Sequence, residues 1–351
     1  MIIDEAQFVA KRDASFMEAV AKLKKHKLYP GPVLIILATS STVWATQEAA
    51  EQFKGAEMKL ESLNFLDVVR HFESLPVAEI VRIYGAIGGV PAYLDKWDAA
   101  KSFKDNICRL VLTPSGALYG EADAVISSGL RELSAYSTIL AAIARGENKL
   151  NDIFHATGFS RAKISVYLKN LAAFNIVEKV VSFETGGWEN AKKGVYQIKD
   201  TFVNFWFKFV YPNMSNLYLL SPEEFYDTYI EKELDAYLER YFREVCTEYL
   251  LILNQMGQLP FTIKRVGTWI GKTGRIDIVA QSEDRRSIIG FCNWDKPMMT
   301  MDMCENMAMA MEQARLTSDD YYLFSATDFE PALQSYVVRD PRFKLINMNE
   351  L

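Results

Sequence analysis

The sequence predicts a multidomain chain in which α/β and α+β parts follow one another. Its 351 residues are half hydrophobic and about a quarter charged, a composition that lets two or more domains each bury a core. The apolar pattern also changes along the chain. Short apolar runs typical of buried strands come first, and helical stripes follow. A helix-turn-helix with a hairpin then precedes a region where helices and strands alternate.

Composition and charge exclude several classes of protein. The longest apolar runs, such as residues 33–38, are far too short to cross a bilayer, and the acidic start of the chain lacks the basic residues of a secretory signal. Three histidines and four separated cysteines predict neither a zinc site nor a disulfide framework. We therefore expect a cytoplasmic protein with reduced thiols and no membrane contact. The cysteines are Cys108, Cys246, Cys292 and Cys304.

Residues 1–56 indicate two buried parallel strands with a helix between them. The first strand ends in Asp4 and Glu5, and the second, residues 33–39, is followed by Ser40. In nucleotide hydrolases one carboxylate of such a pair holds a water bound to magnesium, and the other polarises the attacking water. A polar residue on the neighbouring strand can sense the terminal phosphate. Many strands also end in acidic residues that do no chemistry, and the pattern alone favours that interpretation.

Residues 57–128 are predicted to be helical. Apolar residues recur at helical spacing in two stretches, and Gly88 to Pro91 ends one helix and begins the next. Such stripes are most often core, so we expect packing and no chemistry here. The stripes are Leu63, Leu66, Val69 and Phe72, then Ile80, Ile83, Tyr84 and Ile87.

Residues 129–200 predict a winged helix-turn-helix. A first helix is followed by a tight turn at residues 157–159, and Ser160 can cap a second helix. Two β-like runs follow, Ile176–Phe183 and Gly194–Ile198. This order is typical of a winged helix, whose second helix can lie in a DNA major groove. The residues expected to face inward are Leu150, Ile153, Phe154, Ile164, Leu168 and Leu171.

The exposed residues of this module favour contact with double-stranded DNA. From Arg145 to Lys199 there are nine Lys and Arg against five Asp and Glu, a local charge of +4 in a chain whose net charge is −6. Basic side chains on one face can neutralise phosphates. The alternative is a winged helix used only for packing or dimerisation. The predicted DNA contacts are Arg161, Lys163, Ser165 and Lys169 on the second helix, and Lys192 and Lys193 in the loop of the hairpin.

Residues 201–221 form an aromatic segment that links the winged helix to the last domain. Six aromatic residues lie between Thr201 and Tyr211, and Lys208 is the only basic residue among them. A groove for single-stranded nucleic acid interleaves aromatic and basic residues. Packing between domains is therefore the better explanation of this segment.

Residues 222–351 predict a restriction-endonuclease-like α/β domain. A long helix to about Met256 precedes three strands, a helix and two further strands with a helix between them, which is the order of that nuclease core. The expected strands are residues 261–270, 274–281, 287–294, 321–325 and 344–347, with a helix at 302–316.

Metal-dependent cleavage on this core needs a helix carboxylate, two strand acids and a nearby lysine. Glu244 and Asp277 occupy the first two positions. The next strand resembles one that carries a Glu-x-Lys-Trp pattern in related proteins, and this resemblance implies that Phe291 stands where the second acid should be and Asn293 where the lysine should be. A phenyl ring cannot ligate magnesium and an amide carries no charge, so we expect this metal site to be vestigial. The cations expected to pair with Asp277 are Arg275, Lys272 and Arg265.

Six stretches in a fixed order resemble one known family. They are MIIDEAQ, LIILATSS, LESLNFLDVVRHF, IVRIYGAIGGVPAYL, the winged helix and TFVNFWFKFVYPN. The resemblance covers nearly the whole chain and is to the archaeal-type AAA-related ATPases that carry a C-terminal domain of unknown function. It implies that Asp4 and Glu5 are the Walker B pair, that Ser40 or Ser41 is the first sensor, and that residues 57–128 are the helical lid. It also implies ATP and magnesium as the cofactors of the family.

This chain departs from that family in two respects. The phosphate-binding loop GxxxxGK(S/T), which the family carries upstream of the Walker B strand, occurs nowhere in the sequence. The nearest match, Gly267–Thr273, is one residue short and leads into a strand. The arginine pair expected before the lid is missing from Phe53–Glu57. We therefore expect residues 1–56 to be a truncated P-loop ATPase remnant, in a fragment, an internal start or half of a split gene that binds no ATP by itself.

Three functions remain as hypotheses. The first is a DNA-binding regulatory protein of the ATPase family that does not hydrolyse ATP alone and carries a degenerate nuclease-like domain. The second is an ATPase completed in trans, in which a partner chain or another copy of this chain supplies the P-loop for Asp4, Glu5 and Ser40. The third is a divergent magnesium-dependent nuclease in which Asp295 and Lys296 replace the missing groups.

Overall fold

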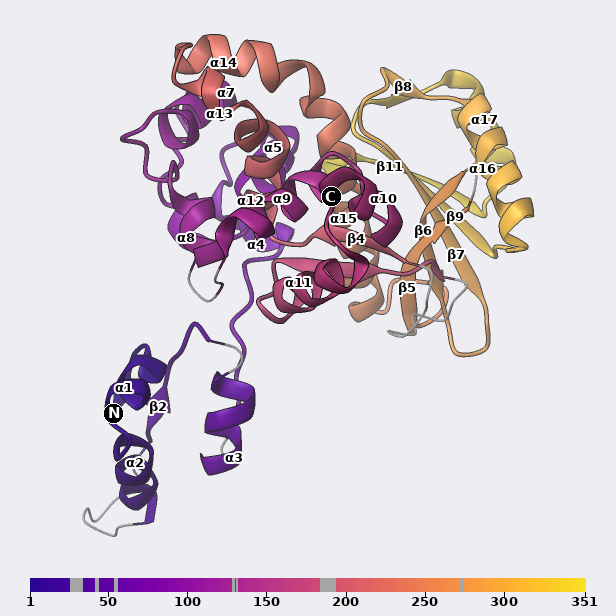
Figure 1. Cartoon of the computed structure of the whole chain (residues 1–351). Coiled ribbons are helices and arrows are strands. Elements are labelled where there is room, and N and C mark those ends of the chain that lie inside the picture. Colours follow the sequence, from indigo (N-terminus) through magenta and orange to yellow (C-terminus); the bar gives the residue numbers. More distant parts are fainter. Residues whose placement is uncertain are drawn as a thin grey trace.

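The structure is a computed structural model of the chain. It describes residues 1–25, 34–41, 44–53, 56–127, 130, 132–183, 194–271 and 274–351. A small N-terminal unit comes first, followed by a body of helices that carries a hairpin, and then by a sheet with helices on both faces (Figure 1). Within the described residues, no helix is both long enough and apolar enough to span a membrane.

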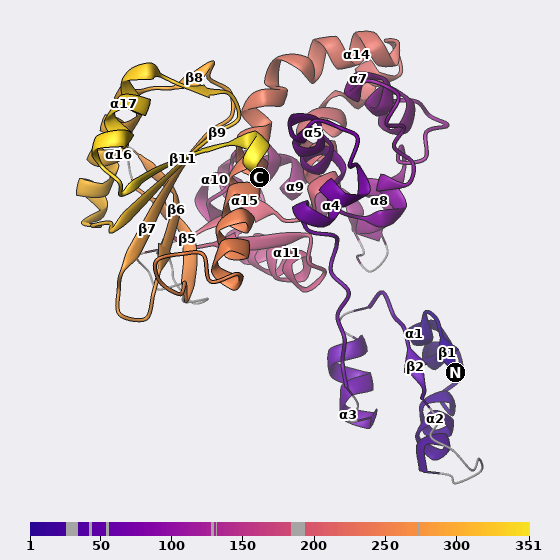
Figure 2. The same ribbon diagram turned by 180° about the vertical axis from the view of Figure 1, so that it is seen from behind.

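The N-terminal unit is built on two short parallel strands. Ile2 pairs with Ile36 and Ile3 with Leu37, so the predicted parallel pair forms, but each strand is only two residues long. Two strands cannot cover their own apolar face, and Ile2 remains 71 % exposed. Figures 1 and 2 show this unit standing apart from the rest of the chain. Its elements are β1 (Ile2–Ile3), α1 (Ala6–Arg12), α2 (Phe16–Lys25), β2 (Ile36–Leu37), the π-helix η1 (Trp44–Ala49) and α3 (Ala50–Phe53).

The body begins with helices whose buried faces agree largely with the predicted stripes. Ile80, Ile83 and Ile87 are buried as expected. In α4, which Asn64 caps, the buried residues include Phe65 and Val68, one position before the predicted Leu66 and Val69. The elements are α4 (Phe65–His71), α5 (Val77–Ile87), α6 (Pro91–Leu94), α7 (Phe103–Ile107), the π-helix η2 (Cys108–Leu112), α8 (Glu121–Ser127) and α9 (Leu133–Ala144).

Two glycines join α5 to α6. Gly88 has a φ of 69°, a conformation that favours glycine, and Pro91 begins α6 as predicted. Gly89 lies directly against the backbone of Leu63, whose N–H donates to the Gly89 carbonyl at 2.8 Å. A Cβ at residue 89 would stand 1.9 Å from the Leu63 carbonyl oxygen. The glycines therefore allow the end of α5 to meet the segment before α4.

The aromatic segment is helical and buried. It forms α12 (Thr201–Phe205), the π-helix η4 (Trp206–Val210), the 3-10 helix η5 (Tyr211–Asn213) and α13 (Met214–Leu217). Its α12 packs against α5. Phe202, Phe205, Trp206, Phe207 and Phe209 are all buried, so the prediction of packing is confirmed. The segment predicted as a linker is thus part of the core.

Helix, turn, helix and hairpin form in the predicted order. Gly158, with a φ of 70°, ends α10, and the Ser160 hydroxyl caps α11 by accepting from the Lys163 N–H at 3.2 Å. The predicted inward residues are buried, except Leu150 and Phe154, which are half-buried. The elements are α10 (Leu150–Thr157), α11 (Arg161–Ala173), β3 (Val177–Val180) and β4 (Val195–Ile198), the last two antiparallel.

The first strand of the hairpin ends earlier than predicted because its continuation docks on the C-terminal sheet. Beyond Val180, Phe183 is buried against Trp269 and its neighbours. Arg265 donates to the Phe183 carbonyl at 3.1 Å, and the Ile270 N–H donates to the Ser182 hydroxyl at 3.0 Å. The hairpin and the sheet are therefore in direct contact.

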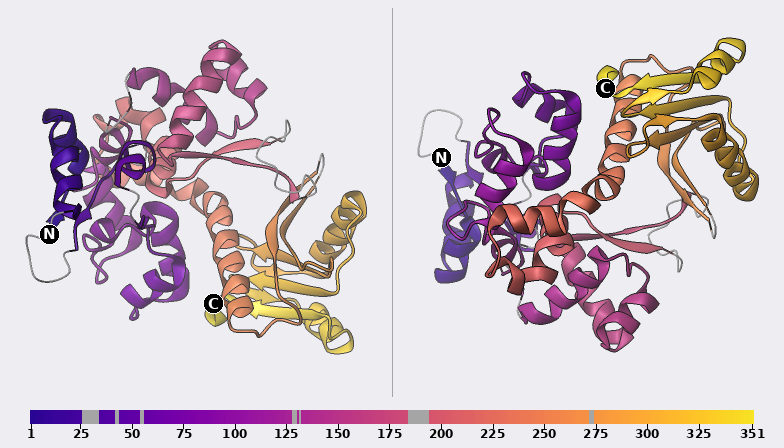
Figure 3. Two further views of the ribbon diagram at one scale, coloured as in Figure 1. Left: turned by 90° about the horizontal axis from the view of Figure 1, so that it is seen from below. Right: turned by 90° about the horizontal axis from the view of Figure 1, so that it is seen from above.

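The predicted long helix is two helices, α14 (Pro222–Tyr229) and α15 (Glu231–Gln255). Ser221 and Glu224 form a capping box at the start of α14. The chain departs from ideal helical geometry at Ile230, with a φ of −110°, and the Ile230 side chain is fully buried. In both views of Figure 3, α15 lies between the helical body and the sheet.

The C-terminal sheet has five strands in the order β11-β9-β7-β6-β5. Strands β5, β6 and β7 are antiparallel, and β7, β9 and β11 are parallel. Ile278 and Ile288 join the core that contains α15, and Val279 and Ile289 join a second core with α16 and α17. The elements are β5 (Arg265–Ile270), β6 (Arg275–Gln281), β7 (Ser287–Asn293), β8 (Met298–Met299), α16 (Met301–Ala314), β9 (Asp320–Ser325), β10 (Asp328–Phe329), α17 (Pro331–Arg339), β11 (Phe343–Asn347) and the 3-10 helix η6 (Met348–Glu350).

Candidate functional site

The carboxyl ends of β1 and β2 bring two of the predicted nucleotide-site residues together. The Ser40 hydroxyl donates to Glu5 Oε2 at 2.9 Å, and the Ser40 N–H donates to the same oxygen at 3.3 Å. Gln7 donates to Glu5 as well, and it accepts from the Thr39 hydroxyl at 2.6 Å. These bonds, first from Gln7 and then from Ser40, lower the pKa of Glu5. Glu5 is therefore held as a carboxylate.

Asp4 lies beside this group without joining it. Its carboxylate accepts from the Glu5 N–H at 2.9 Å and is exposed. Glu5 itself has a φ of 46°, a left-handed conformation that is rare outside glycine. This turn directs the two carboxylates to different places. The Asp4 carboxylate faces solvent, and the Glu5 carboxylate contacts Ser40. Among the described residues, the polar group at this sheet edge consists of Glu5, Gln7, Thr39 and Ser40.

Asp277 is buried beside two arginines, of which Arg243 is half-buried and Arg275 is exposed. Its side chain is only 7 % exposed, and the Arg275 Nε donates to Oδ1 at 2.9 Å, which confirms one of the predicted pairings. Arg243 Nε lies 3.1 Å from the same oxygen but off the hydrogen-bond direction, so this contact is an ion pair. The Cys292 N–H donates to the other oxygen at 3.1 Å. Burial, and then the nearby Arg275, lower the pKa of Arg243.

The other predicted metal ligand faces away from this cluster. Glu244 is exposed and pairs with Arg240 at 2.8 Å on its own helix. The residue of α15 that reaches Asp277 is Arg243, one position earlier. A cation at Asp277 would have to compete with two arginines already there. Within the described parts of the chain, no three His, Cys, Asp or Glu side chains are grouped so that they could hold a metal ion.

Asn293 and Phe291, which stand where a lysine and an acid were expected, both make structural contacts. Asn293 is buried, its amide donates to Lys296 O and Ser325 Oγ at 3.2 and 3.1 Å, and its carbonyl accepts from the Lys296 N–H at 3.2 Å. Asn293 thus ties the end of β7 to β9 and to the following turn. Phe291 packs against the second core of the sheet. Asp295 and Lys296 pair with each other at 2.6 Å in the exposed turn.

Two of the cysteines that are far apart in the sequence are neighbours in space. Cys246, on α15, and Cys292, on β7, belong to the same core, and both are free thiols. Burial, and then Cys292, raise the pKa of Cys246. The two cysteines come together because α15 packs across β7. The sequence could not indicate this proximity, because the two cysteines are 46 positions apart on elements whose packing is not known from the sequence.

The predicted DNA contacts on α11 are exposed, except Lys163, which is half-buried. Arg161 lies over the Phe154 ring, 4.1 Å from its centroid, and its Nη2 donates to Asn151 Oδ1 at 2.5 Å. Lys163 lies over the rings of Phe159 and Tyr167, at 4.5 and 5.3 Å. These aromatic contacts hold two cations at the start of α11 in defined positions.

The remaining predicted DNA contacts differ in whether their polar groups are already hydrogen-bonded within the protein. Ser165 is exposed, but its hydroxyl donates back to the Arg161 carbonyl at 2.9 Å. Lys169 is exposed on the same side of α11. Lys192 and Lys193 lie outside the described residues.

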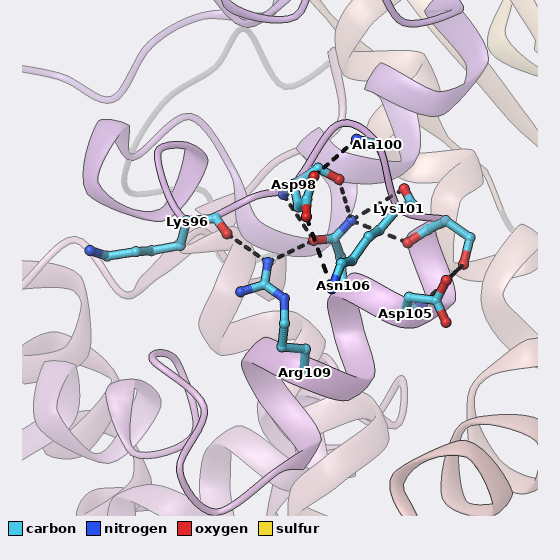
Figure 4. Close-up of polar contacts among 8 residues, drawn as sticks. Lys96, Asp98, Ala100, Lys101, Asp105, Asn106 and Arg109 are labelled. Atoms are coloured by element: carbon cyan, nitrogen blue, oxygen red, sulfur yellow. Dashed lines mark hydrogen bonds and ion pairs between the residues drawn. The ribbon is translucent and has the colours of Figure 1, made fainter.

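A polar loop in the helical body carries a group that the sequence pattern did not indicate. Asn106, fully buried, accepts from the Asp98 N–H at 3.0 Å and from Arg109 at 2.9 Å, and its amide donates to the Asp98 carbonyl (Figure 4). Arg109 also donates to the Lys96 carbonyl at 2.8 Å. Lys96, Lys101 and Arg109 line a surface pocket of about 620 Å³ together with Asp105 and Glu223. Its mixed charges select no class of ligand.

Comparison with known proteins matches part of the chain to a family of unknown function. Residues 206–309 match the family DUF234, described as archaeal and bacterial proteins of unknown function. The expected domain of unknown function is thereby confirmed over this range, which begins inside the aromatic segment. An uncharacterized protein of Methanocaldococcus jannaschii is 27 % identical over 335 residues, which cover 93 % of this chain and 74 % of the relative.

Two solved structures are more distant. A Walker-type ATPase of Pyrococcus abyssi is 17 % identical with a TM-score of 0.38, over 59 % of this chain and 62 % of that one. A Vibrio cholerae protein is 10 % identical with a TM-score of 0.25, over 71 % of this chain and 54 % of that one. The chain thus spans less than two thirds of the length of each.

Proposed function

We propose that this protein binds double-stranded DNA through the solvent side of α11 and that it does not hydrolyse ATP by itself. The observation that carries the proposal is the charge of this helix. Its thirteen residues include Arg161, Lys163 and Lys169 and no acidic residue; Arg161 and Lys169 are exposed, and Lys163 is half-buried. A helix with this charge can lie in a major groove, where the phosphates of both strands flank it.

The attachment of α11 to the rest of the protein supports the same proposal. Its core-facing residues Ile164, Leu168 and Leu171 are buried, and Ser160 fixes its first turn. The helix is therefore a rigid support, and the positions of Arg161 and Lys163 are defined before any ligand arrives. Preorganised cations lose less conformational entropy when they bind a phosphate.

The arrangement around Asp277 favours a structural role for the nuclease-like part. A catalytic carboxylate must be free to bind a metal ion, whereas Asp277 is buried between Arg243 and Arg275. We infer that this domain, which contacts the hairpin through Phe183, serves as a scaffold for the DNA-binding module.

The proposal predicts that Lys169→Ala weakens binding to any duplex. A single lost phosphate contact should lower the slope of log K against log salt by about 0.9 and weaken binding about eight-fold at 0.1 M salt. Lys232→Ala is the matched control, because Lys232 is also an exposed lysine on a helix, α15. Fluorescence anisotropy with a labelled duplex, measured from 0.05 to 0.3 M salt, gives both quantities. Equal slopes for the parent and for Lys169→Ala would contradict the proposal.

A second candidate function is an ATPase site completed in trans. The observation that favours it is the hydrogen bond between Glu5 and Ser40, which places a carboxylate and a hydroxyl at the ends of adjacent parallel strands. In such a site Asp4 would hold magnesium through water and Glu5 would activate the attacking water. The P-loop would come from another polypeptide.

This second candidate predicts ATP turnover only in a mixture. The chain alone should release no phosphate from ATP, and adding a polypeptide with a GxxxxGK(S/T) loop, encoded in the adjacent reading frame, should start turnover. Glu5→Gln should then lower the rate by about a hundredfold or more. Glu18→Gln is the control, since Glu18 is an exposed residue of the same unit. Turnover by the chain alone, or turnover in the mixture that Glu5→Gln leaves intact, would rule this candidate out.

A further inference from the structure

The solvent side of α11 carries small apolar groups as well as cations. Ala162, Ser165, Val166 and Lys169 follow the spacing i, i+3, i+4 and i+7, so they form one stripe along the helix, and all four are exposed. Val166 is in the middle of this stripe and is 57 % exposed. Its neighbours one turn away are Ala162 and Asn170, so the apolar part of the stripe consists of short side chains only.

Val166 belongs to neither hydrophobic core of the described residues. The buried side of α11 is occupied by Ile164, Leu168 and Leu171. A β-branched residue has a lower helix propensity than alanine, leucine or lysine, which are the usual residues at exposed helix positions. Val166 therefore lowers the stability of the helix slightly while it keeps two methyl groups in water.

The groups around Val166 match what the major groove presents. Phosphates lie at the edges of the groove; Lys169 belongs to the stripe, and the exposed Arg161, which lies over the Phe154 ring, directly precedes Ala162 in the helix. Between the phosphates, thymine is the base that offers an apolar group, its C5-methyl, and short apolar side chains contact that methyl. The Ser165 hydrogen is engaged with the Arg161 carbonyl, so the centre of the stripe presents methyl groups and few donors.

We propose that Val166, with Ala162 beside it, contacts the C5-methyl of thymine, and that the ligand of this surface is duplex DNA with thymine at one or two fixed positions. This inference rests on the proposed DNA binding through α11 and names the base that it reads. Duplex RNA does not fit, because its deep, narrow major groove excludes side chains and its uracil lacks the methyl.

The test changes the DNA first, so that no variant has to fold. A duplex enriched by the parent protein from a random pool is compared with copies in which deoxyuridine replaces thymidine one position at a time, which removes only the methyl. At one or two positions we expect about four-fold weaker binding, the effect of one buried methyl group. At the other positions, and outside the footprint, affinity should not change.

Two variants then assign the effect to a residue. Val166→Ser should bind the thymidine and deoxyuridine duplexes equally well. Val338→Ser, at an exposed valine of α17, should discriminate as the parent does. Equal affinity of the parent for all the duplexes, with Lys169→Ala still weaker, would overturn this inference and leave the proposed function standing. Discrimination that survives Val166→Ser would overturn it as well. Absence of duplex binding by the parent would overturn both.

Discussion

Replacing Asp277 by alanine should lower the free energy of unfolding by about 3–5 kcal/mol. The Arg243 side chain is only 16 % exposed, and Asp277 is the carboxylate that lies against it. The variant leaves a buried guanidinium beside Arg275, a second cation, without the negative charge between them. It also leaves the Cys292 N–H without its acceptor. Urea denaturation followed by circular dichroism measures this change.

Glu244→Ala is the matched control for this experiment. Glu244 was predicted together with Asp277 as a remnant of one metal site, but it is an exposed partner of Arg240. Its removal should cost less than about 1 kcal/mol. A catalytic pair predicts the opposite result, with little change in stability for either variant and loss of magnesium-dependent plasmid nicking for Asp277→Ala. That outcome would restore the nuclease hypothesis.

Gly89→Ala should lower the free energy of unfolding by about 3 kcal/mol, the upper end of the range for overpacking. The new Cβ would lie 1.9 Å from the Leu63 carbonyl oxygen and 2.8 Å from its carbonyl carbon. Backbone atoms cannot move aside as a side chain does, so the hydrogen bond from the Leu63 N–H to the Gly89 carbonyl should be strained or lost. Thermal unfolding measures the shift in Tm.

Gly120→Ala separates this clash from a general effect of glycine replacement. No atom lies within 4 Å of the position where a Cβ would stand at residue 120. This variant should unfold with an unchanged free energy or with one about 0.4–1 kcal/mol higher, because alanine restricts the unfolded chain. If both variants lost a similar amount of unfolding free energy, the close approach of residue 89 to Leu63 would not be the reason for glycine at this position.

The ends of helices were predicted well where a single residue, such as a capping serine, a glycine or a proline, marks the end. Ser160 caps α11, Gly158 ends α10 with a positive φ, and Pro91 begins α6, each as the sequence indicated. The strands of the C-terminal sheet also lie close to their predicted bounds. Caps and turns depend on bonds within a few residues, so their chemistry can be read without the fold.

The candidate sites were predictable in part. Glu5 and Ser40 meet because parallel strands place their carboxyl ends at one edge of a sheet, and that rule needs only the order of the strands. Glu244 was assigned to Asp277 because it is an acid on the right helix. Arg243 is there instead, since polar neighbours one position apart give no indication of which of them faces the sheet.

The sequence by itself determined the order of most helices and strands, the caps and turns between them, the cations of α11 and the uncharged residues Phe291 and Asn293. Only the tertiary structure decided that Phe183 docks on β5, that Cys246 meets Cys292, and that two arginines enclose Asp277. The first group depends on interactions between residues near one another in the chain. The second depends on how α15 and the hairpin pack against the sheet, and that packing reflects the shapes of whole surfaces.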